Sequence, residues 1–73
     1  MKIVLSNHAK DRLLSRGFEI QQIKRVIKNP IETKNQSYGN IKTKGVLEDQ
    51  RILIVIYKII KTKIIIITCY YEN

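Results

Sequence analysis

The chain has 73 residues and a formal charge of +8, from 14 lysines and arginines against 6 acidic residues. A chain of this length forms one domain, expected over residues 1–73, and leaves no room for a separate regulatory domain. A domain of this size buries only about 60% of the surface of its unfolded form, so its core is thin. The hydrophobic fraction of 44% indicates a folded domain and excludes a disordered tail. The charge suits nucleic acid, an acidic partner protein or an anionic membrane surface.

A first helix is predicted between Ser6 and Gly17. Serine is a favoured N-cap residue, and glycine is the commonest residue just after a helix end. Ala9 and Leu13 give this helix an inward, apolar side. The local signals therefore define both ends of the helix and the side that faces the core.

The same helix carries the only histidine, His8, followed at steps of four residues by Arg12 and Arg16. Residues four apart lie on one side of a helix, so one imidazole and two guanidinium groups could converge on one anion. Arginine binds phosphate oxygens with two parallel hydrogen bonds, and histidine moves protons near neutral pH, so a phosphodiester fits this set. The alternative is a packing or capping histidine beside two arginines that only add surface charge.

A second helix is predicted over residues 18–29, where isoleucine and valine recur at helical spacing and Pro30 follows. After Pro30 the pattern changes to that of strands. Short strands are predicted at residues 31–34 and 41–47, the second with Lys42 and Lys44 on one side, as at a wet, basic edge. Residues 51–59 and 63–71 are predicted as long central strands joined by a turn at 61–62. The predicted fold is α+β, with two N-terminal helices packed on a three- to four-stranded antiparallel sheet.

Cysteine and histidine are too few for the common metal centres. The single Cys69 cannot form an intramolecular disulfide, and with His8 it falls short of the usual zinc ligand sets. We therefore expect no metal and no cofactor. The apolar stretch 52–71 is broken by Lys58, Lys61 and Lys63, which argues against a membrane span, and the chain start shows no signal peptide. A cytoplasmic protein is expected.

Residues 6–17 fit the pattern S-x-H-A-x-x-R-x-x-x-R-G, and residues 66–70 form an apolar strand that ends in Thr-Cys-Tyr. Together these features resemble a small prokaryotic family of unknown function that is itself similar to the RelE/ParE-type toxins of toxin–antitoxin systems. That resemblance implies two helices on an antiparallel sheet. It also implies either metal-independent cleavage of mRNA or, as in ParE-type toxins, inhibition of DNA gyrase. The chain differs from RelE in carrying its histidine and arginines on the first helix.

Residue chemistry and resemblance together predict a metal-independent endoribonuclease. Such a reaction needs a base, an acid and positive charge on the phosphate. We assign proton transfer to His8 and phosphate binding to Arg12 and Arg16, with Tyr70 as a second proton-transfer group or a stacking surface. The predicted nucleic-acid-binding residues are Arg12, Arg16, Lys42, Lys44, Arg51 and Tyr71.

Each of these assignments has a structural alternative. Arg51 could pair with Glu48 or Asp49, and the strand tyrosines could close the edge of the core. At the level of function, two other classes stay open. One is a module that binds nucleic acid or an acidic antitoxin without catalysis, and the other is an interaction protein that forms a homodimer through its isoleucine-rich sheet.

Overall fold

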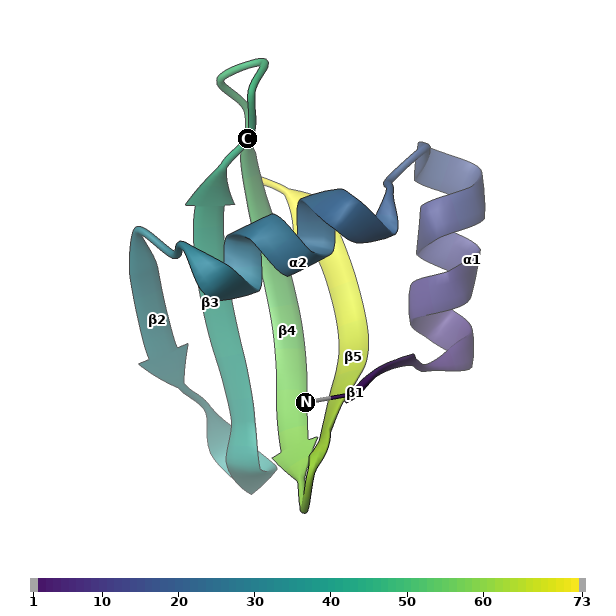
Figure 1. Ribbon diagram of the computed structural model, residues 1–73, viewed down its shortest axis with the longest axis vertical. Helices are drawn as coiled ribbons and strands as arrows, with labels where there is room; N and C mark the ends of the chain where they lie inside the picture. The colour runs from purple at the N-terminus through teal and green to yellow at the C-terminus, as the bar shows by residue number, and fades with distance from the viewer. Residues whose placement is uncertain (1, 73) are drawn as a thin grey trace.

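The computed structural model describes residues 2–72, in which two helices lie against a five-stranded sheet (Figure 1). The α+β class with two N-terminal helices is confirmed. All four strands expected after Pro30 are present, each within one residue of its predicted start. The elements are β1 (Lys2–Leu5), α1 (Asn7–Arg16), α2 (Ile20–Lys28), β2 (Glu32–Asn35), a 3₁₀ turn (Ser37–Gly39), β3 (Asn40–Val46), β4 (Ile52–Ile60) and β5 (Lys63–Tyr71).

The sheet differs from the prediction by one strand and one pairing direction. Its order is β1-β5-β4-β3-β2, and β1 runs parallel to β5 whereas all other pairs are antiparallel. The prediction of three to four antiparallel strands missed β1. Its four residues show too little periodicity to indicate a strand, and its partner β5 lies at the opposite end of the sequence. Only the tertiary pairing makes this segment a strand.

Capping residues define the start of both helices and the end of α1. Ser6 caps α1 by accepting a hydrogen bond from the Ala9 amide at 3.1 Å, and Gly17 ends the helix in the left-handed conformation at φ 72°. Glu19 begins α2 with a capping box, because the Gln22 side chain accepts from the Glu19 amide while the Glu19 side chain accepts from the Gln22 amide. Neither helix of the described chain has both the length and the apolar content to cross a membrane.

The core lies between the helices and one side of the sheet, which we call the helix face. Figure 1 shows α2 crossing in front of β3 and β4, with α1 beside β5. Gly45 of β3 allows the closest approach, because a Cβ atom there would lie 2.9 Å from Val26 Cγ2. The buried residues of this core are Ala9, Phe18, Ile23, Val26, Leu47, Leu53, Val55, Ile66 and Cys69.

The opposite side of the sheet, which we call the open face, carries no helix of residues 2–72 (Figure 1). Side chains alternate along a strand, so the residues between Leu53 and Val55 and their cross-strand partners point to this side. The open face therefore has an apolar centre bordered by lysines. Its apolar residues are Val46, Ile52, Ile54, Ile56, Ile65 and Tyr70, and its lysines on β2, β3 and β4 are Lys34, Lys42, Lys44 and Lys58.

Candidate functional site

The candidate site starts from the side of α1 that carries His8, Arg12 and Arg16, here called the α1 ladder. The helix is fixed to the sheet at its first turn, because the Ser6 hydroxyl donates to the Ile67 carbonyl of β5 at 2.9 Å while it also caps the helix. His8 and Arg16 are exposed, and Arg12 is half-buried. The ladder therefore lies on a helix that is anchored to β5 at its first turn, with the two ends of the ladder exposed to solvent.

His8 and Arg12 are in contact. Arg12 Nε donates a hydrogen bond to His8 Nε2 at 3.5 Å, the long end of the range for such bonds. A guanidinium group next to the imidazole gives the site a fixed positive charge beside a group that can accept a proton.

Arg12 also acts toward the sheet. Burial raises the pKa of the Cys69 thiol on β5, and the positive charge of Arg12 opposes part of that rise. Cys69 itself is a buried free thiol of the core, as expected for a cysteine in an apolar strand.

Two predicted nucleic-acid-binding residues, Arg51 and Tyr71, form a stacked group at the end of the sheet. The Tyr71 ring packs against Phe18 with 4.8 Å between ring centroids, and the Arg51 guanidinium carbon lies 4.1 Å from the centroid of the Tyr71 ring. Arg51 also pairs with Asp49, with 2.6 Å from Nε to Oδ2, and its backbone and side-chain hydrogen bonds hold the pKa of Asp49 below its ordinary value. This arrangement is the structural alternative stated above for Arg51.

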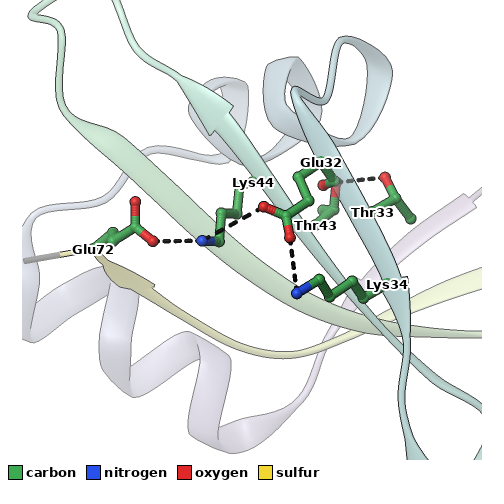
Figure 2. Close-up of polar contacts among 6 residues, drawn as sticks. All are labelled: Glu32, Thr33, Lys34, Thr43, Lys44 and Glu72. Carbon is green, nitrogen blue, oxygen red and sulfur yellow. Dashed lines mark hydrogen bonds and ion pairs between the residues drawn. The ribbon is translucent and has the colours of Figure 1, made fainter.

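Lys44 is engaged on the open face. Its ammonium group contacts Glu72 Oε1 at 2.5 Å and Glu32 Oε2 at 3.7 Å, and Glu32 also pairs with Lys34 at 3.1 Å (Figure 2). The bond to Glu72 raises the pKa of Lys44, whereas Lys34, followed by Lys44, lowers that of Glu32. Lys42 belongs to the same strand and the same face, and no carboxylate of residues 2–72 lies within 4 Å of its ammonium group.

Tyr70 also belongs to the open face, since its cross-strand partner is Ile54. It is partly exposed and, among the described residues, has no hydrogen bond to His8 or to either arginine of the ladder. The structure thus joins His8 with Arg12 directly, and places Lys42, Lys44 and Tyr70 together on the open face. Arg51 and Tyr71 lie apart from both sets, in the stacked group with Phe18.

Sequence analysis missed Glu32 and Glu72 as partners of Lys44. The two-residue spacing of Glu32 and Lys34 indicated only that these two residues share a side of a strand, whereas Glu32 reaches Lys44 because β2 and β3 pair in this register. Glu72 follows β5 and reaches Lys44 only because β4 and β5 pair in this register, which no local signal encodes.

A hollow of about 820 Å³ lies between α2 and the connection from β3 to β4, and no residue of the α1 ladder lines it. It is lined by polar side chains of both signs, and Arg25 and Glu48 pair across part of it at 3.4 Å. Within residues 2–72 no group of three histidine, cysteine, aspartate or glutamate side chains could hold a metal ion. The chemistry available to the described chain is therefore that of arginine, lysine, histidine and tyrosine.

These features define a small basic α+β domain with a histidine–arginine pair on its first helix. The family model described as "Domain of unknown function (DUF4258)" matches residues 5–71, so the chain belongs to this family. The match covers the whole opening pattern of residues 6–17 and the closing strand. A curated protein similar to the chain was not found, and neither was a similar solved structure.

Proposed function

We propose that the protein is the toxin of a type II toxin–antitoxin system and acts as a metal-independent endoribonuclease on mRNA. The observation that carries the proposal is the 3.5 Å hydrogen bond from Arg12 Nε to His8 Nε2 on α1. An imidazole that can take up a proton, next to a guanidinium that can bind phosphate oxygens, supplies two of the functions that phosphodiester cleavage without a metal needs. The charge of +8 on 73 residues supports an RNA substrate and an acidic antitoxin as partners.

The proposed reaction is an internal transfer at phosphorus. His8 takes the proton of a ribose 2′-hydroxyl, and the resulting oxyanion attacks the adjacent phosphorus to form a 2′,3′-cyclic phosphate. The bond from phosphorus to the 5′-oxygen breaks, and that oxygen takes a proton from water, because the predicted second proton-transfer group, Tyr70, lies on the open face of the sheet and not beside the ladder. Arg12 and Arg16 stabilise the extra negative charge on the pentacoordinate phosphate.

The test is RNA cleavage and growth arrest by His8→Ala and Arg12→Ala, with Lys10→Ala as the matched control. Lys10 is an exposed cation on the same helix but outside the ladder. Loss of a general base lowers the rate by about 10²–10⁴-fold, so His8→Ala should abolish growth arrest, and Arg12→Ala should also weaken RNA binding. Cleavage should continue in EDTA. Equal activity of His8→Ala and the unmodified protein, both folded by circular dichroism, would reject the catalytic role of His8.

One observation favours a second function, a module that binds RNA or an acidic antitoxin without cleavage. In the described part of the chain, His8 makes its side-chain hydrogen bond to Arg12 and to no acid that would complete a proton-transfer pair. Such a module would bind RNA in a salt-dependent manner, with Arg12→Ala and Arg16→Ala weakening binding and His8→Ala leaving it nearly unchanged. A ParE-like inhibitor would instead act on its protein target and spare RNA.

A further inference from the structure

The open face exposes apolar surface that the fold itself does not cover. Ile52, Ile56 and Ile65 remain partly accessible, and no helix of residues 2–72 lies over them. Ile54 is only 3% exposed although it is not part of the core beneath the helices. The sheet register places it between Lys44 and Tyr70, so side chains of the neighbouring strands shield it. The centre of this face is therefore a strip of branched aliphatic side chains.

Lysines border this strip, and they are close enough to repel one another. Lys34 and Lys42 are direct cross-strand partners on β2 and β3. Lys58 is diagonal to Lys42, because Lys42 pairs with Ile56, two residues before Lys58. Like charges directly opposite on neighbouring strands destabilise a sheet. Lys42 and Lys58 have no carboxylate partner within residues 2–72, so an incoming negative charge would relieve this repulsion.

The chain already shows how carboxylates bind to this face. Glu72 and Glu32 hold the Lys44 ammonium group from two sides, next to the position of Ile54 (Figure 2). The side chain of Lys44 is only 21% exposed in this arrangement. At Lys44, then, the protein already pairs its own carboxylates with a lysine that borders the aliphatic strip.

We propose that the open face binds an acidic amphipathic helix of a partner protein. Its apolar side would cover Ile52, Ile56 and Ile65, and its flanking glutamates or aspartates would pair with Lys42 and Lys58. Helices bind apolar surfaces in this way through residues at positions i, i+3, i+4 and i+7. The inference rests on the proposed function only for the existence of an acidic protein partner, and it does not require RNA cleavage.

Two other occupants fit the face less well. Single-stranded RNA binds to sheets by stacking bases on aromatic rings, whereas the strip is aliphatic except for Tyr70. A second copy of the chain would bring a second charge of +8 to a face bordered by lysines. An acidic helix complements both the aliphatic centre and the positive border.

The test is a fluorescence-anisotropy titration with a synthetic helical peptide of about 15 residues that has leucines on one side and glutamates on the other. A scrambled peptide of the same composition and a short single-stranded RNA are titrated alongside it. We expect the ordered peptide to bind and the scrambled one to bind at least about tenfold more weakly, with affinity falling as salt rises. Failure of the ordered peptide to bind better than the scrambled one would overturn the proposal.

Variants then locate the binding surface. The double change Lys42→Glu and Lys58→Glu should weaken peptide binding by about tenfold or more, and Ile56→Ala severalfold. Lys24→Glu is the matched control, since Lys24 is an exposed cation of α2 on the other side of the sheet. If the double change weakens RNA binding but not peptide binding, the face is an RNA surface and the proposal is wrong. His8→Ala should leave peptide affinity unchanged, so loss of catalysis and loss of this interface are distinguishable.

Discussion

The helix face and the open face of the sheet are built from the same isoleucine-rich strands but are shielded from water by different means. On the helix face, Leu53 and Val55 are fully buried beneath the helices. On the open face, the intervening Ile54 is shielded by its cross-strand neighbours Lys44 and Tyr70, and Ile56 stays partly exposed. Residues of the helix face are buried because the helices pack on them. On the open face, Ile54 is buried because long side chains of neighbouring strands cover it, and one of these, Lys44, is held in place by ion pairs.

The largest difference between the two faces should appear on truncation of their aliphatic residues. Leu53→Ala leaves a cavity in a packed core and should lower the free energy of unfolding by about 2–5 kcal/mol, whereas Ile56→Ala should cost less than half of that. Urea denaturation of both variants measures the difference. If Leu53→Ala does not fold, the milder pair Ile66→Val and Ile56→Val gives the same comparison. Equal losses on the two faces would show that the open face is packed as tightly as the core.

A smaller effect is expected where the helix face approaches α2 most closely. The added Cβ of Gly45→Ala would lie 2.9 Å from Val26 Cγ2 and 3.0 Å from Val26 Cα, so the helix must move and the cost should be about 1–3 kcal/mol. Gly17→Ala is the control for a glycine without contacts, because a Cβ atom added there would have no neighbour within 4 Å and only the φ of 72° opposes the change. Its cost should be about 1 kcal/mol. The same urea titration would contradict this ranking if Gly17→Ala were the more damaging change.

The contribution of the open face to the stability of the fold should depend on pH through Lys44 and its carboxylate partners. The folded-state pKa of Glu32 is lowered by Lys34 and then Lys44, so its stabilising contribution is present above its ordinary value of 4.5 and is lost as pH falls through the lowered pKa. The pKa of Lys44 is raised, chiefly by Glu72, so its contribution is present below 10.5 and is lost as pH rises through the raised pKa.

Lys44→Met should remove the dependence at high pH and reduce the one at low pH, because Lys34 still lowers the pKa of Glu32, while it keeps an aliphatic stem beside Ile54. Its thermal midpoint should fall below that of the unmodified protein between about pH 5 and pH 10, and the difference should shrink at either extreme. Lys24→Met, on the exposed side of α2, is the control. A constant difference at all pH values would mean that Lys44 stabilises the open face through its stem alone.

The smallest effect is expected at the end of the sheet. Arg51→Ala removes an exposed ion pair to Asp49 and the stacking on Tyr71, which together should cost about 1 kcal/mol or less. The pKa of Asp49 should rise toward its ordinary value, but not fully, because the backbone amide of residue 51 still donates to the carboxylate. An NMR titration of Asp49 checks this, and an unchanged pKa would show that the backbone bond alone sets it.

Local chemistry predicted the parts of the fold that depend on neighbouring residues. Ser6 and Gly17 defined the ends of α1, and the change of periodicity at Pro30 separated helices from strands. Long-range pairing was not predictable in the same way. The strand β1 was missed because its identity depends on β5, and the engagement of Lys44 depends on the Glu72 side chain.

In the candidate site, too, the contacts between near neighbours in the sequence were predictable and the long-range contacts were not. The contact between His8 and Arg12 follows from a helical step of four residues, so the spacing predicted it. Arg51 and Tyr71 were grouped with the nucleic-acid-binding residues on residue type alone, and their contacts with Asp49 and Phe18 come from the meeting of a turn, a strand end and the α1–α2 connection. Their role on RNA stays a prediction.

The parallel pairing of β1 with β5 also determines when the domain can be completed. Ser6, just after β1, bonds to the Ile67 carbonyl of a strand 61 residues further along the chain. During synthesis the segment that becomes β1 leaves the ribosome before its partner β5, so α1 cannot reach its final anchorage until β5 has emerged. The helix that carries His8 and Arg12 is therefore made well before the strand that fixes it in place.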